Sequence, residues 1–98
     1  MFVRILPGDA SGPAGKLADA ELVFADGPLA GLKLVGFGIW ERRGGGRNVT
    51  FPARTFAVNG ERRSFALLRP ERDQAATDAI RDVILEAFAA SRVEAKSA

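Results

Sequence analysis

The spacing of the apolar residues changes once along the chain, and this change constrains the fold more than any other feature. Up to residue 69, apolar residues come in short runs that alternate with polar residues or stand between glycine and proline breakers. Such runs are typical of β-strands. From residue 76 the apolar residues recur every three or four positions, as on one side of a helix. Because strands come first and one helix follows, the sequence predicts an α+β fold.

The predicted architecture is an antiparallel β-sheet of about five to six short strands, over about residues 2–69, followed by one C-terminal amphipathic helix. Asn59-Gly60 indicates a two-residue hairpin turn because both residues tolerate positive φ. Residues 9–15, rich in small residues and breakers, are predicted to be a loop. The predicted strands are Phe2–Leu6, Leu17–Phe24, Leu32–Trp40, Asn48–Phe51, Thr55–Val58 and Arg62–Leu68.

The strand Leu32–Trp40 is apolar on both of its faces. Gly36 and Gly38 interrupt it and indicate a bulge or the close approach of another element. Since one helix covers one face, the other face or a sheet edge is predicted to pair with a second copy, giving a homodimer. Strict alternation places Leu32, Leu34 and Trp40 on one face and Val35, Phe37 and Ile39 on the other.

The helix is predicted over about residues 73–90, with Asp73 or Pro70 at its start and a frayed tail at 91–98. Leu85 falls outside the apolar stripe and is expected to contact something other than the home sheet. The whole chain, 1–98, is predicted to be a single domain. The stripe consists of Ala76, Ile80, Val83, Ile84, Ala87 and Phe88.

The chain contains neither histidine nor cysteine, which argues against an enzyme. The usual general base and the thiol nucleophile are both missing, and so are disulfides and the common zinc-binding spacings. Asp78 and Asp82 lie four residues apart, but a solvated helix face explains them better than a metal pair does. No cofactor, metal or small-molecule substrate is therefore predicted.

No apolar run approaches the length of about 18 residues that a membrane-spanning helix needs. The first residues also lack the pattern of a signal peptide. We therefore expect a cytoplasmic protein without a membrane partner.

Arginine is concentrated in the middle of the chain. Residues 1–40 carry a net charge of −1, residues 41–69 carry +5 and residues 70–98 carry −2. Such asymmetry indicates a polyanionic partner, DNA or RNA, although a solvated hairpin surface is the alternative. The candidate nucleic-acid-binding residues are Arg42, Arg43, Arg47, Arg54, Arg62 and Arg63.

Three consecutive glycines, Gly44–Gly46, lie between these arginines. They do not form a nucleotide-binding P-loop, which needs a lysine, a hydroxyl residue and then a helix. We interpret them as the flexible tip of a basic hairpin that lets the backbone approach a phosphate. Trp40, next to this tip, is a candidate for stacking on a base. Phe51 and Phe56 share that possibility, but we expect both in the core.

The order of these parts resembles the SpoVG family (stage V sporulation protein G, or septation regulator). The resemblance rests on the strand 32–40, a glycine-containing turn, the segment "GRNVTFP" at 46–52, a second hairpin with Asn59-Gly60, and a proline before the terminal helix. It covers about residues 16–90 and implies a small homodimer, built by sheet extension, that regulates by binding DNA or RNA.

The chain departs from the family pattern at Leu67-Leu68-Arg69, where the family usually carries an acidic residue and a histidine. The sequence thus predicts a small, non-enzymatic, SpoVG-like nucleic-acid-binding regulator. The alternative is a protein–protein interaction or structural dimer module that binds no nucleic acid.

Overall fold

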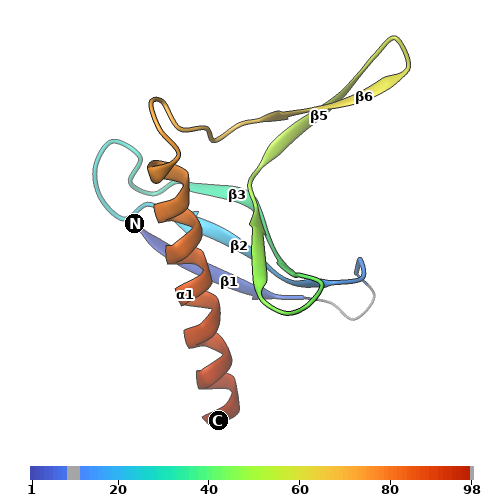
Figure 1. Ribbon diagram of the computed structural model, residues 1–98. Helices are drawn as coiled ribbons and strands as arrows, with labels where there is room; N and C mark the ends of the chain where they lie inside the picture. Colours follow the sequence, from blue (N-terminus) through green and yellow to red (C-terminus); the bar gives the residue numbers. More distant parts are fainter. Residues whose placement is uncertain (9–11, 98) are drawn as a thin grey trace.

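The computed structural model describes residues 1–8 and 12–97, so part of the predicted loop at 9–15 lies outside the described residues. Within these described residues, six antiparallel strands precede one C-terminal helix, which confirms the predicted α+β class (Figure 1). The elements are β1 (Phe2–Pro7), β2 (Lys16–Val23), β3 (Lys33–Glu41), β4 (Arg47–Thr50), β5 (Ala53–Val58), β6 (Glu61–Ala66) and α1 (Ala75–Ser97).

The strands divide between two sheets rather than forming one. Strands β1 to β4 pair in chain order, and β5 pairs only with β6. Pro52 separates the two sheets because it has no N–H to continue a ladder. Its carbonyl accepts a hydrogen bond from the Leu67 N–H at 3.0 Å and closes the base of the second hairpin. We call this projecting hairpin, residues 53–66, the arm (Figure 1).

The arm turns at Asn59 and Gly60, whose φ angles are 52° and 82°, as the sequence predicted. Every residue of β5 and β6 is exposed. The radius of gyration is 15.0 Å, whereas a compact domain of about 100 residues has about 13 Å. The accessible surface is 7262 Å², against about 5400 Å² for a compact chain of this mass. The arm therefore gives the molecule surface that a compact fold would bury.

A bulge at Gly36 changes which face of the sheet the side chains of part of β3 point to. Leu22 pairs with Leu34 and Ala20 pairs with Phe37, so β3 carries one extra residue in this interval. Gly36 absorbs it at φ 107°, a conformation that side-chain-bearing residues rarely adopt. Strict alternation was therefore wrong here: Leu34 shares the core face with Phe37, and Val35 is 51% exposed.

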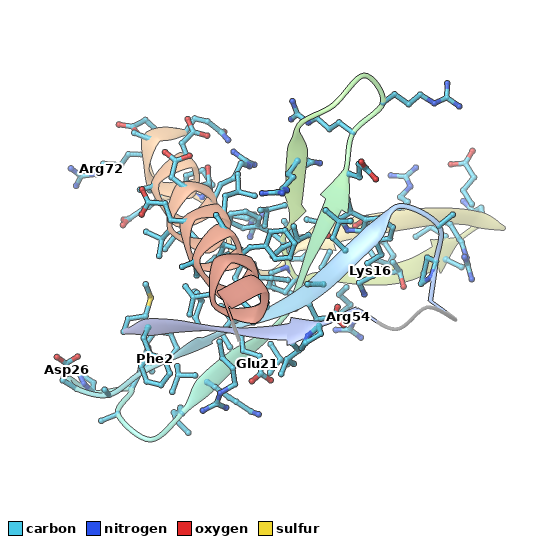
Figure 2. The ribbon with its side chains drawn as sticks, turned by 90° about the horizontal axis from the view of Figure 1, so that it is seen from below. Phe2, Lys16, Glu21, Asp26, Arg54 and Arg72 are labelled. Atoms are coloured by element: carbon cyan, nitrogen blue, oxygen red, sulfur yellow. The ribbon has the colours of Figure 1, made fainter. Side chains whose placement is uncertain are left out.

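The core lies between one face of the four-stranded sheet and α1, while the other face has no helix over it. We call the uncovered side the outer face; Figure 2 shows Phe2 and Glu21 on it. The buried core residues are Ala18, Ala20, Leu22, Phe37, Ile39, Val49, Ile84 and Phe88.

The helix presents a slightly different stripe from the predicted one. Ile80 and Leu85 pack against the core, whereas Val83 is exposed. The sequence prediction was therefore wrong for both residues, since it placed Val83 against the sheet and Leu85 away from it. The buried stripe of α1 is rotated toward Thr77, which is also buried. At the start of α1, the Asp73 carboxylate accepts the Ala75 N–H at 2.9 Å, which supports the predicted Asp73 cap. The helix continues to Ser97, past the predicted end near residue 90.

Candidate nucleic-acid interface

The six candidate arginines lie in two separate groups. Arg42 and Arg43 are in the turn between β3 and β4, and Arg47 is the first residue of β4. Arg54 lies on β5, whereas the remaining two are on β6. Figures 1 and 2 show the turn and the arm pointing in different directions from the body. The structure therefore does not bring the six residues into one patch.

The three glycines form the tip of the β3–β4 hairpin, as the sequence predicted, and the space around them is open. Gly44, Gly45 and Gly46 all have positive φ, at 82°, 99° and 85°, and a side chain at any of them would meet nothing within 4 Å. The Arg42 guanidinium donates to the Asn48 Oδ1 at 3.5 Å. The Arg47 guanidinium lies 4.8 Å from the centre of the Phe88 ring. Arg47 is thus turned toward the helix, in a cation–π contact that leaves it less free than Arg42.

The arm has two chemically different faces. Residues that pair directly across two strands point to the same side of the ribbon. One side, which we call the aromatic face, combines arginine with phenylalanine: its pairs are Arg54–Phe65, Phe56–Arg63 and Val58–Glu61. The opposite side, the small-residue face, has the pairs Ala53–Ala66, Thr55–Ser64 and Ala57–Arg62.

On the aromatic face both rings are accessible: Phe56 is 40% and Phe65 is 46% exposed. The expectation that Phe56 is a core residue was therefore wrong, because the chain leaves the body at Pro52 and every residue of β5 and β6 is exposed. A further arginine, Arg69, lies over the Phe65 ring at 4.4 Å from its centre. Sequence reasoning missed Phe65 and Arg69 as site residues, although Phe65 lies inside the predicted strand Arg62–Leu68 and Arg69 follows it directly.

Phe51 is in the core, as expected. Its ring packs edge-to-face on Phe37, with centroids 5.3 Å apart and planes at 67°. The Arg81 guanidinium lies 5.5 Å from the centre of the same ring. Phe51 is therefore partly buried, with its ring packed against the core.

Trp40 is anchored on the outer face rather than free. Its indole N–H donates to the Thr50 hydroxyl at 2.9 Å, and the Lys16 ammonium lies 5.7 Å from the ring centre. A methyl group at Gly38 would come within 2.7 Å of the indole nitrogen. Gly38 thus leaves the space that the indole occupies.

Gly38→Ala is expected to displace the indole and to lower the free energy of unfolding by about 1–3 kcal/mol, as overpacking does. Denaturant unfolding followed by circular dichroism measures this loss. The same substitution in a Trp40→Ala background should cost less, because the new methyl group no longer meets the indole, although the Thr50 hydroxyl stays 2.9 Å from it. An equal loss in both backgrounds would attribute the cost to Thr50 or to the backbone and not to the indole.

The outer face also holds a cluster of charges. The Glu21 carboxylate is 10% exposed and lies 3.4 Å from the Arg4 Nη1 and 3.1 Å from the Lys33 Nζ. Around this cluster of two cations and one carboxylate, Phe2, Leu6 and Val35 are exposed on the same face. The outer face therefore combines exposed apolar side chains with charged ones, and no helix of the described residues covers it.

Within residues 1–8 and 12–97, no three acidic, histidine or cysteine side chains gather in a way that suits a metal ion. No helix in the described part of the chain has the length and apolar character to cross a membrane. Neither a protein-family model, nor a curated protein, nor a solved structure matches the chain.

Proposed function

We propose that the chain is a small nucleic-acid-binding regulatory protein that holds the phosphate backbone of DNA or RNA with its arginines. The observation that carries the proposal is the exposed arm, which projects Arg54, Arg62 and Arg63 into solvent against one acid, Glu61. Within the described residues, the only ion pair of the arm joins Arg63 to Glu61 at 3.6 Å. Neutralising phosphates releases counterions, so affinity should depend steeply on salt.

The resemblance of residues 16–90 to the SpoVG family supports the same function. It favours a cytoplasmic regulator that works as a homodimer and needs neither a membrane nor a small-molecule substrate. The turn residues Arg42 and Arg43 add a second basic site to the proposal. Arg47 and Trp40 contribute less, since both side chains already have partners in the protein.

The direct experiment is a gel-shift with a mixed set of single-stranded and duplex oligonucleotides at about 100 mM salt. We expect a shift that weakens steeply as salt rises, because phosphate contacts dominate non-specific binding. Retention on heparin, measured in parallel, reports the same basic surface. A folded protein that shifts no oligonucleotide and passes through heparin would contradict the proposal.

The alternative function is a protein–protein interaction or structural dimer module without nucleic acid. It is favoured by the exposed apolar side chains Phe56, Val58, Phe65 and Leu67 on and beside the arm. Exposed apolar patches commonly mark protein interfaces. A module of this kind should show a partner-dependent change of mass and no salt-dependent binding to polyanions.

The homodimer that we propose uses the outer face, where Phe2, Leu6 and Val35 are exposed. Two copies that bury this face would each cover apolar area, and a self-complementary contact closes with two-fold symmetry. We expect light scattering at micromolar concentration to give twice the chain mass. Val35→Glu should shift the mass toward the monomer by burying an unpaired charge.

Val83→Glu is the matched control, because Val83 is exposed on α1 away from the outer face. This variant should keep the dimer mass. A monomer mass for the wild type, or equal dissociation by both variants, would count against the outer face as the dimer contact.

A further inference from the structure

We infer that the aromatic face of the arm selects single-stranded over duplex nucleic acid. Phe56 and Phe65 would each stack on a base, while Arg54, Arg63 and Arg69 hold the flanking phosphates. This inference rests on the proposed function and names the form of nucleic acid that the arm takes.

The spacing of the Phe56 and Phe65 rings favours bases that are not stacked on each other. Phe56 pairs with Arg63 and Phe65 pairs with Arg54, so the phenylalanines are diagonal neighbours on one face. Diagonal positions on an antiparallel pair are about 7–8 Å apart, whereas each strand of a duplex advances about 3.4 Å per base. Two bases that stack on rings this far apart must have left their own stack. A single strand offers such bases, and a duplex keeps them stacked on each other.

A positive charge lies beside each of the two rings. Arg63 stands directly opposite Phe56, and Arg54 stands directly opposite Phe65. Arg69 adds a guanidinium over the Phe65 ring, 4.4 Å from its centre, so a base that stacks on Phe65 must take the opposite face of the ring or displace this guanidinium. Each base-stacking position therefore has a cation at its side, which is the combination that sequence-tolerant single-strand binders use.

The charge on the aromatic face differs between the tip and the base of the arm. Glu61 lies next to the tip, opposite Val58, and its carboxylate is 3.6 Å from the Arg63 guanidinium. The base of the arm carries Arg54 and Arg69 without a described acid pairing with either. A phosphate backbone is therefore favoured toward the base of the arm and disfavoured at its tip.

A two-stranded ribbon also fits the major groove of duplex DNA. Base edges in the groove are read by hydrogen bonds, which phenylalanine does not make. The polar residues suited to that task, Thr55, Ser64 and Arg62, are on the small-residue face. Duplex binding through the arm would thus use the opposite face, so substitutions on the two faces separate the two modes.

The test compares Phe56→Ala/Phe65→Ala with Thr55→Ala/Ser64→Ala on the opposite face. Fluorescence anisotropy would measure the affinity for a labelled single-stranded oligonucleotide and for its duplex, at the same salt. We expect the phenylalanine variant to lose at least about 30-fold on the single strand, since two stacking contacts are lost. Its duplex affinity and its salt slope should hardly change, and Phe56→Trp/Phe65→Trp should retain single-strand binding.

The control variant should bind the single strand like the wild type, and circular dichroism establishes that each variant is folded. Equal wild-type affinity for single strand and duplex would overturn the inference and leave the proposed function standing. A folded phenylalanine variant that binds the single strand normally would also overturn the inference. A phenylalanine variant that changes mass in light scattering would overturn it too, because the rings would then lie in a subunit contact. Binding of neither form by the wild type would remove the proposed function itself.

Discussion

Ile84→Ala is expected to lower the free energy of unfolding by about 2–5 kcal/mol, the range for removing a large buried aliphatic side chain. Ile84 is fully buried and belongs to the same core cluster as Phe37 and Ile39. The chain has a single helix in its described part to cover the sheet, so a cavity at this contact weakens the whole helix–sheet layer. Denaturant unfolding followed by circular dichroism measures the loss as a lower midpoint with a similar slope.

Val83→Ala is the matched control, since Val83 is the preceding residue on the same helix but is exposed. Its substitution should change the free energy of unfolding by less than about 1 kcal/mol, as surface changes do. The contrast also tests the orientation of α1, because the apolar stripe predicted from the sequence placed both Val83 and Ile84 against the sheet. Equal losses for the two variants would restore that stripe and contradict the observed helix orientation.

The features that sequence predicted well are the local ones. The change of apolar period at Pro70, the Asn59-Gly60 turn and the glycine turn each depend on a few neighbouring residues. Asp73 as a helix cap is likewise a local signal, because its carboxylate reaches an N–H two residues ahead. Such features are readable because the physical cause and the residues that carry it lie within one turn of chain.

The side-chain faces of β3 were harder to predict, because a bulge shifts every residue beyond it. Gly36 signalled a bulge, but alternation alone does not tell which residue is extra. Leu34 therefore changed sides, and only the pairing with β2 fixes its place. One added residue reverses a strand face, so local pattern and register must be known together.

The arm shows a second limit of sequence patterns. Arg54, Phe56 and Val58 alternate as in a half-buried strand, and alternation indicates a face without showing what covers it. Pro52 indicates the end of a strand, but it does not show that the next two strands, β5 and β6, leave the body of the molecule. The separation of the arginine groups follows: Arg47 and Arg54 are seven residues apart in extended chain, a span of up to about 23 Å.

Replacing Arg54, Arg63 and Arg69 together with glutamine, which we call the arm variant, is expected to weaken single-strand binding by about 100-fold at 0.1 M salt, because all three lie beside the rings of the aromatic face. Each neutralised phosphate contributes about 0.7 to the slope of log affinity against log salt for a single strand. Losing three contacts therefore lowers the slope by about 2, which corresponds to two decades of affinity between 1 M and 0.1 M salt. The loss should be similar for all sequences, because phosphate contacts position a protein and do not specify bases.

The comparator is Arg42→Gln/Arg43→Gln in the glycine turn, which leaves Arg47 on Phe88. Under the proposed function, the turn variant loses less than the arm variant, because it removes two guanidinium groups rather than three. Affinity at several salt concentrations and a melt on each variant measure both effects. The melts should nearly coincide with the wild type, since exposed charged side chains contribute little to stability.

The arm and the turn make different demands on a bound strand, so the pattern of losses locates its path. A loss confined to the arm variant places the strand on the arm alone. Equal losses from arm and turn would mean that the strand runs along β4 and reaches both basic groups. Unchanged affinity and slope in a folded arm variant would exclude the arm from the interface, whatever the turn contributes, because three neutralised phosphate contacts cannot leave the salt dependence intact.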